Sequence, residues 1–239
     1  MKNLFLSIFT IFMCNGILRS QELTVEYNFG YGAFCMREFK NALNDLKNAG
    51  QVNNLKITDN FSGNWINQAK VSIELKQMHQ FGLSFEYMNT TGQLAVSDYS
   101  NPYKAVLDAS GTKLGVFYRI TPKVFSKKTV RPYFLLSGGI VLNDVKASED
   151  LVIYEEKTAG LREKITGINS FIEPAIGAKI RLNKYFAINI SGGYQLDLSR
   201  NLNNKIQSRE IEIEDLNIAP TWSGLRFNAG VILYIPLRQ

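Results

Sequence analysis

The feature of this sequence that most constrains its fold is a period-two alternation of large apolar and polar residues. Between positions 63 and 76, Trp65, Val71 and Ile73 share one face, whereas Lys70 and Glu74 share the other. Side chains two residues apart lie on the same side of a β-strand, so this pattern predicts strands. It recurs in 81–87, 114–120, 168–182, 186–198 and 225–235, and less regularly in 23–34 and 130–144. The chain therefore contains eight predicted strands.

The lengths of the strands and of their connections favour a membrane barrel over a soluble sandwich, which also alternates. Segments of about 12 to 17 residues exceed the usual soluble strand and are long enough to cross a bilayer. The long connections are 35–62, 89–102, 146–166 and 200–221, and the short ones are 77–80, 121–128 and 183–184. Short turns at one end and long loops at the other predict an all-β fold, an eight-stranded antiparallel transmembrane up-and-down β-barrel.

The composition agrees with a barrel whose apolar residues face outward. Hydrophobic residues make up 45% of the 239 residues, which excludes a disordered chain. The mean hydropathy is nevertheless only −0.10, which argues against a bundle of membrane-spanning helices. In a barrel, one half of each strand faces lipid and the other half is polar and interior, so a mean hydropathy near zero is expected.

The N-terminus has the order of parts found in a secretory signal peptide. Lys2 precedes the apolar run Leu4–Met13, and Ser20 is a small residue at the expected cut. The run is too short to cross a bilayer as a helix. We therefore expect residues 1–20 to be a signal peptide and residues 21–239 to be the outer-membrane barrel domain.

The processing of this N-terminus leaves two alternatives open. Cleavage after Gly16 is one, and lipidation of Cys14 is the other. Removing the signal peptide takes away Lys2 and Arg19 and no acid, which lowers the net charge from +6 to +4. Cys35 is then the lone cysteine, so no intramolecular disulfide is expected.

Several segments carry a resemblance to a known family. They are QLAVSDYSNPY at 93–103, PYFLLSGG at 132–139, IEPAIGAKIRL at 172–182 and FNAGVILYI at 227–235. With them, the chain resembles the small eight-stranded outer-membrane barrels of Gram-negative bacteria, of the OmpA/OmpX-like or PorT-like kind. Members often end on an aromatic residue, whereas this chain ends Pro236, Leu237, Arg238, Gln239, with Tyr234 as the aromatic residue nearest to that end.

The polar faces of the predicted strands place charged side chains inside the barrel. We expect a lumen charge network of Glu74, Glu86, Lys113, Arg119, Glu173, Lys179, Asp197 and Arg226. An eight-stranded barrel has room for side chains but not for an open aqueous pore. Charges in such a space must pair or keep water. An ion-paired filling is the preferred interpretation, and a proton or ion path is the alternative.

The sequence offers few groups for catalysis or for a cofactor. His79 is the only histidine, and it falls in a short turn on the expected periplasmic side, away from lipopolysaccharide in the outer leaflet. Cys35 has no histidine nearby in this topology. No zinc spacing, P-loop or dinucleotide motif is present. We therefore predict no catalytic, cofactor-binding or metal-binding residue.

The long external connections hold the features on which specificity would depend. Met36, Phe39, Leu43 and Leu46 recur at helical spacing, which predicts a short helix over Met36–Asn48, ended near Gly50. This helix either caps the barrel mouth or binds a partner. The segments 151–154 and 209–215 alternate with period two and are expected to extend their hairpins.

Two charged groups in the connections are interpreted as solvated surface. The acids Glu210, Glu212, Glu214 and Asp215 form the first group, for which a divalent cation is the alternative. The bases Lys123, Lys127, Lys128 and Arg131 form the second, around a short turn. These bases lack interleaved aromatic residues and indicate contact with anionic headgroups or simple solubility rather than nucleic acid.

These observations lead to three hypotheses about function. The first is a non-enzymatic integral outer-membrane barrel, either structural or part of an envelope, secretion or surface assembly. It would contact outer-membrane lipids and lipopolysaccharide, and protein partners at its external loops, with its oligomeric state left open. The second is a lipid-modifying or proteolytic barrel enzyme, and the third is a soluble lipocalin-like barrel that binds an apolar ligand.

Overall fold

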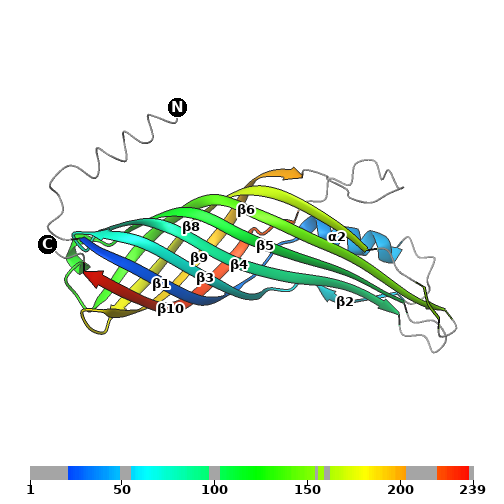
Figure 1. Ribbon diagram of the computed structural model, residues 1–239, viewed down its shortest axis with the longest axis horizontal. Helices are drawn as coiled ribbons and strands as arrows, with labels where there is room; N and C mark the ends of the chain where they lie inside the picture. Colours follow the sequence, from blue (N-terminus) through cyan, green and yellow to red (C-terminus); the bar gives the residue numbers. More distant parts are fainter. Residues whose placement is uncertain are drawn as a thin grey trace.

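Eight strands form a closed antiparallel barrel in the computed structural model, which describes residues 21–48, 55–96, 103–153, 156–158, 162–202 and 220–236 (Figure 1). Neighbouring strands pair around the ring, and β1 closes it by pairing with β10. The barrel strands are β1 (Gln21–Gly32), β3 (Asn64–Leu75), β4 (His79–Val96), β5 (Tyr103–Ile120), β6 (Val130–Ile153), β8 (Arg162–Arg181), β9 (Phe186–Leu202) and β10 (Gly224–Pro236). The predicted fold class is confirmed.

Four smaller elements accompany the barrel strands. They are the helix α2 (Arg37–Asn48), the strands β2 (Lys56–Asn60) and β7 (Glu156–Thr158), and the 3₁₀ turn η2 (Lys123–Phe125). The predicted helix in the first external connection is confirmed, with acidic Glu38 in its first turn and basic Lys47 in its last, as the helix dipole favours. No helix in the described part of the chain is long and apolar enough to cross a membrane.

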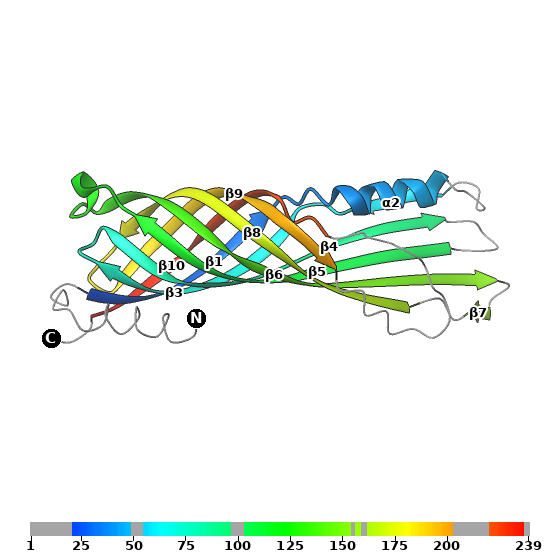
Figure 2. The same ribbon diagram turned by 90° about the horizontal axis from the view of Figure 1, so that it is seen from above.

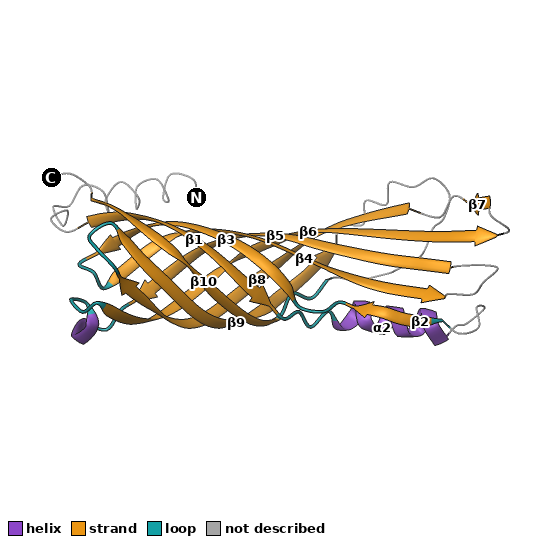
Figure 3. Ribbon diagram, turned by 90° about the horizontal axis from the view of Figure 1, so that it is seen from below, coloured by secondary structure: helices purple, strands orange, loops and turns teal. Residues whose placement is uncertain are grey.

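The two ends of the barrel differ in their connections. At one end, here called the turn end, short turns join β3 to β4, β5 to β6 and β8 to β9. At the other, the loop end, α2 and β2 lie together between β1 and β3 (Figure 3). The predicted segments 1–20, 209–215 and Gly50 lie outside the described residues.

A belt of exposed large apolar side chains surrounds the barrel on all eight strands. The pairing register aligns these side chains from strand to strand, since Val25 on β1 is opposite both Val71 and Leu233. Members of the belt include Val25, Tyr27, Phe29, Trp65, Val71, Phe81, Leu83, Phe85, Leu114, Val116, Phe134, Leu136, Ile168, Ile176, Ile188, Ile190, Phe227 and Val231. A soluble protein does not leave so much contiguous apolar surface in water, and a belt of this kind is the lipid-facing surface of a transmembrane barrel.

Aromatic side chains stand at the loop-end edge of the belt. The Phe29 and Trp65 rings stack with centroids 4.8 Å apart, and Tyr31 meets Trp65 edge-on at 5.7 Å. Aromatic girdles at this height mark the boundary between hydrocarbon and headgroups in transmembrane barrels. The belt therefore ends near Tyr31 and Trp65.

The strands β4, β5, β6 and, over residues 162–167, β8 continue past this boundary. The strands β4, β5 and β6 reach far beyond β1 and β10 at the loop end (Figure 2). Much of the connections predicted at 89–102 and 146–166 is therefore strand, since β4 runs to Val96 and β6 to Ile153. The predicted hairpin extension at 151–154 agrees with this for residues 151–153.

The polarity of the two strand faces inverts where the strands leave the belt. On β4, the outward side chains change from Phe85 and Tyr87 to Asn89 and Thr91, while the inward ones change from charged Glu86 to Met88 and then Leu94. The same alternation thus continues with opposite chemistry. The outward apolar pattern ends at this point, so the sequence alone predicts a connection where the structure has strand.

The inward face of this region packs on the helix. We call this whole region the loop-end extension, and it consists of α2, β2 and the strand parts 89–96, 103–111, 143–153 and 162–167. Met36, Phe39 and Leu43 are buried with Phe61 and Leu94 in one apolar core. The Phe39 and Phe61 rings meet at 5.3 Å. The extension is therefore a folded part of the molecule whose apolar core continues into the barrel mouth, where it includes Phe171 and Trp222.

Candidate functional site

The interior of the barrel at the level of the belt is filled by charged side chains. Among the described residues, ten of them are buried, six cations and four carboxylates. They are Glu26, Lys70, Glu74, Glu86, Lys113, Arg119, Arg131, Glu173, Lys179 and Arg226. Taking a charge out of water costs several kcal/mol unless it is paired, so the geometry of the pairs decides whether this interior is stable.

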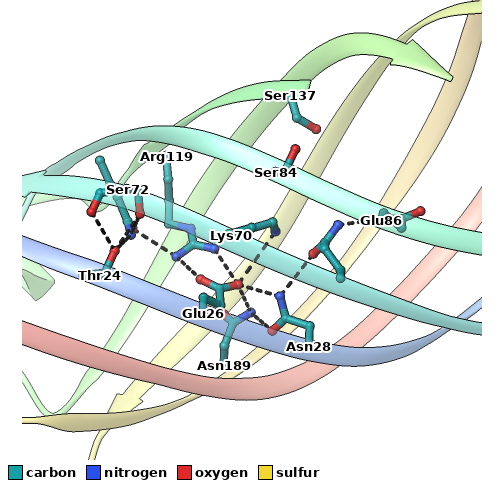
Figure 4. A network of polar contacts seen from close by, with 12 residues as sticks. Thr24, Glu26, Asn28, Lys70, Ser72, Ser84, Glu86, Arg119, Ser137 and Asn189 are labelled. Atoms are coloured by element: carbon teal, nitrogen blue, oxygen red, sulfur yellow. Dashed lines mark hydrogen bonds and ion pairs between the residues drawn. The ribbon is translucent and has the colours of Figure 1, made fainter. Parts of the chain in front are cut away.

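The middle cluster is centred on Glu26 of β1 and Arg119 of β5 (Figure 4). Arg119 Nη1 donates to Glu26 Oε2 at 2.9 Å and Arg119 Nη2 to Glu26 Oε1 at 3.2 Å, a two-pronged pair. Lys70 Nζ lies 3.7 Å from Glu26 Oε1. Asn189 Nδ2 also donates to Glu26, at 3.0 Å. The Arg119 guanidinium lies 4.3 Å from the centroid of the Tyr133 ring, which adds a cation–π contact.

A second cluster lies nearer the turn end. Lys179 Nζ donates to Glu74 Oε2 at 2.6 Å and to Gln80 Oε1 at 2.9 Å. Arg131 Nη1 lies 3.7 Å from Glu74 Oε1. Gln80 Oε1 also accepts from Arg119 at 3.0 Å, so this amide joins the second cluster to the middle one.

A third cluster lies nearer the loop end. Lys113 pairs closely with Glu173 and stands 3.4 Å from Glu86. Arg226 Nε lies 3.7 Å from Glu86 Oε1. Gln68 Nε2 donates to Glu86 Oε2 at 2.6 Å, and Gln68 Oε1 accepts from Asn28 at 3.1 Å. Because Asn28 also donates to Glu26 at 2.7 Å, a continuous chain of side-chain contacts joins all three clusters.

Trp222 closes the interior above the third cluster. Its side chain is fully buried, and its indole N–H donates to Asn143 Oδ1 at 2.6 Å. Its carbonyl accepts from Arg226 at 2.9 Å. Its ring meets the Phe34 ring edge-on at 4.9 Å. The residues just before β10 therefore fold into the barrel mouth and separate the charged interior from the core of the extension.

The structure brings together seven of the eight residues predicted for the lumen. Asp197 is the exception, because it is only partly buried and contacts no cation among the described residues. Asp197 instead accepts from the Trp222 backbone N–H at 2.7 Å and from Gln195 at 2.9 Å. It therefore holds the Trp222 segment in place.

Three members of the interior were missing from the prediction. Glu26 lies on β1, where Thr24, Glu26 and Asn28 alternate with exposed Val25 and Tyr27. This alternation is enough to place Glu26 on the inward face. The alternation places Lys70 on the polar face of its strand, but the predicted network does not include it. Arg131 was grouped with the basic residues of a turn, yet it is buried and pairs with Glu74.

The candidate reactive residues lie apart from one another. His79 is the first residue of β4 at the turn end, and its Nδ1 is 2.8 Å from the Tyr118 hydroxyl. Cys35 is an exposed free thiol next to α2. Among the described residues, no group of three or more His, Cys, Asp or Glu side chains is arranged to hold a metal ion. The acids 210–215 fall outside that part of the chain.

Comparison with solved structures finds outer-membrane proteins at low sequence identity. Neisserial surface protein A aligns over 90% of this chain and 99% of its own, with 10% identity and a TM-score of 0.41. Ail of Yersinia pestis, in complex with a heparin analogue, aligns over 90% and 97%, with 11% identity and a TM-score of 0.36. A major outer membrane protein from Thermus thermophilus aligns over 91% and 100%, with 10% identity and a TM-score of 0.49.

The strand pairing and the apolar belt decide the architecture without these likenesses. The fold is that of a small outer-membrane barrel. The resemblance seen in the sequence agrees with this at the level of the fold. The sequence matches no model of a protein family, and it matches no curated protein.

Proposed function

We propose that this protein is a non-enzymatic integral outer-membrane β-barrel that contributes to envelope structure or forms part of a surface or secretion assembly. The observation that carries the proposal is the filled interior. Three linked ion-pair clusters occupy the barrel at the level of the belt, and Trp222 lies above them. A lipocalin-like binder would need an apolar cavity at this place, and a porin would need open water.

In this proposal the turn end faces the periplasm and the loop end faces the exterior. Short periplasmic turns and longer external loops are the rule for outer-membrane barrels. The belt would contact membrane lipids and the acyl chains of lipopolysaccharide. Residues 1–20 would direct export as a signal peptide.

The loop-end extension is the proposed interaction surface. Its outward face carries polar side chains such as Thr91, Asp108 and Asp144, and its inward face is held by the core around Leu43. A rigid, hydrated surface raised above the membrane favours contact with a protein partner over contact with lipid.

The placement of the titratable groups supports a role without catalysis. His79 lies at the turn end beside a tyrosine hydroxyl, whereas the exposed thiol of Cys35 lies at the loop end. A nucleophile and its base must come within hydrogen-bond reach of one another. The length of the barrel separates these two groups.

The first experiment measures conductance across planar bilayers with the purified protein. We expect no stepwise channel current, because the ion-pair clusters and Trp222 fill the interior. The control is the double variant Trp222→Ala and Arg226→Ala. It removes the side chains that fill the loop-end part of the interior and should raise the current. Regular open-channel steps in the unsubstituted protein would contradict the proposal.

The second experiment tests the interaction surface in intact cells. A photo-crosslinking amino acid at Gln93, on the outward face of the extension, should give a defined protein adduct. The matched control carries the same amino acid at Lys123 at the turn end, where no such adduct is expected. Absence of any adduct from Gln93 and from neighbouring outward positions would remove the assembly role.

A further inference from the structure

An apolar groove crosses the lipid-facing surface of the barrel. Its volume is about 610 Å³, and it lies over the five consecutive strands β5, β6, β8, β9 and β10. Ile120, Phe134, Ile176 and Phe227 are among the side chains that form its walls. The groove belongs to the belt and is separate from the charged interior.

Small residues and a proline create the groove. Gly192 occupies an outward position of β9, where the neighbouring outward positions of the belt carry large side chains. Gly193 and Ala175 form the shallow floor of the groove beside it. A β-carbon added at Gly192 would meet the Phe227 ring at 3.5 Å, an ordinary contact. Pro174 has no amide hydrogen for the ladder between β8 and β9. The depression therefore comes from missing side chains, with room for hydrocarbon.

The groove runs obliquely up the barrel. Its lining residues follow the pairing row from Ile120 through Phe134, Ile176 and Gly192 to Phe227. Four steps between strands at about 4.8 Å each give a length of about 19 Å. Ile120 is the last residue of β5 at the turn end, whereas Phe227 lies near the start of β10 at the loop end. An open apolar groove of this length that rises from one membrane surface has room for an extended acyl chain.

Positive charge gathers where the groove begins. The turn between β5 and β6 exposes Lys123, Lys127 and Lys128, and its Val124 side chain is 73% exposed. These lysines belong to the same hairpin as Ile120 and Phe134. An apolar residue among lysines at the end of a membrane-spanning hairpin is suited to the headgroup region of a bilayer.

The other charges at the turn end do not offset these lysines. The remaining exposed charged residues described there are also basic, Lys76 and Lys184. The carboxylate nearest to this edge, Glu22, is already paired with Arg181 at 2.9 Å. The turn end therefore attracts anions, and two copies packed groove to groove would bring their lysine clusters together, which disfavours a second copy as the occupant.

We propose that the groove holds one acyl chain of an anionic glycerophospholipid, whose phosphate lies beside Lys123, Lys127 and Lys128. The lipid belongs to the leaflet at the turn end, so this inference rests on the membrane insertion assumed in the proposed function. The apolar walls select hydrocarbon, and the lysines select negative charge. The bound lipid would fill the depression and present a smooth belt to the surrounding bilayer.

The test uses phosphatidylcholine vesicles that contain the inserted protein and a spin-labelled lipid. With spin-labelled phosphatidylglycerol, we expect a motionally restricted lipid population that exceeds the one seen with spin-labelled phosphatidylcholine. The relative association constant should favour phosphatidylglycerol about fivefold or more, because each lysine near the surface attracts anionic lipid. Equal restriction of the two lipids would overturn the proposal.

Two sets of variants separate the groove from the charges. Gly192→Leu fills the groove and should abolish the extra restricted lipid, whereas Ala229→Leu places a leucine side chain at an exposed belt position on β10 outside the groove and should not. Replacing Lys123, Lys127 and Lys128 by Gln should remove the preference for phosphatidylglycerol. Replacing Lys76 and Lys184 by Gln, on other turns, should preserve it.

Insertion is measured first, by heat-modifiable migration on gels. If the Gly192→Leu variant inserts but keeps the full preference for phosphatidylglycerol, the proposed lipid site in the groove is wrong and the proposed function still stands. A stable dimer that protects the groove from lipid would also overturn the lipid site, in favour of a second copy. A protein that fails to insert at all would instead contradict the proposed function.

Discussion

The part of the barrel inside the belt and the loop-end extension are built from the same strands with opposite chemistry. On β5, the outward residues are apolar at Leu114 and Val116 and polar at Asp108 and Ser110. The inward residues change from Arg119 and Lys113 to apolar ones in the same interval. The backbone continues without a break, since β5 is one strand from Tyr103 to Ile120.

The medium outside a strand therefore determines which of its two faces is apolar. Where lipid surrounds the barrel, the outward face gains by being apolar, and the interior is left to pair its charges. Where water surrounds the extension, burial of apolar side chains against α2 is the favourable arrangement. The inversion therefore marks the height of the membrane surface on β4, β5 and β6.

The largest expected effect concerns the buried ion pair in the middle cluster. Arg119→Leu removes the two-pronged partner of Glu26 and leaves that carboxylate buried, so the free energy of unfolding should fall by about 3–5 kcal/mol. Reversible urea unfolding in vesicles measures the change. The matched control is Lys164→Leu, which breaks the exposed 2.7 Å pair with Asp144 at the extension and should cost about 1 kcal/mol or less.

Equal losses in these two variants would contradict the view that the two regions are held by different interactions. A second check uses Arg119→Leu combined with Glu26→Leu. This pair of substitutions removes both charges of the two-pronged pair, but it leaves buried Lys70 without the carboxylate that lies 3.7 Å from it, so only part of the stability lost in the single variant should return.

An effect of similar size but different location is expected in the extension. Leu43 is 1% exposed and packs in the core beneath α2, so Leu43→Ala should destabilise this region by about 2–5 kcal/mol. The loss should be local, with faster proteolysis of α2 and unchanged heat-modifiable migration of the barrel. Loss of the folded barrel itself would show that the extension does not unfold independently of the barrel.

A smaller effect tests the boundary directly on one strand. Val116→Arg places a charge on the outward face inside the belt and should cost about 2–4 kcal/mol. Ser110→Arg places the same charge on the same face of β5 beyond the belt and should change stability by about 0.5 kcal/mol or less. Unfolding in vesicles gives both values, and similar costs at the two positions would argue against a membrane surface between them.

The sequence was sufficient for the barrel but not for the extension. Strict alternation at Lys113 and Arg119 placed them inside, because the apolar faces beside them are continuous. Beyond Tyr87, the apolar residues of β4 lie on the inward face. The outward apolar alternation that predicts a membrane strand therefore ends at this residue. The strand beyond that point was therefore interpreted as a loop.

The charged interior could be predicted only in outline. The alternation assigns a residue to a face, and it does not say which inward residues come together across the barrel. Glu26 and Arg119 are far apart in the chain and meet only because the ring closes. Trp222 follows a long connection and has no periodic neighbour, so no sequence signal placed it in the barrel mouth.

The position of the membrane surface on β5 is tested by a spin-label accessibility scan along the outward face of this strand, with Cys35 replaced. Labels at positions 106, 108, 110, 112, 114, 116, 118 and 120 are compared for collision with oxygen and with a water-soluble nickel complex in vesicles. We expect nickel access at Asp108 and Ser110 and oxygen access, without nickel access, from Leu114 to Tyr118. Nickel access at all of these positions would contradict the insertion of the barrel in a membrane, because no part of β5 would then face lipid.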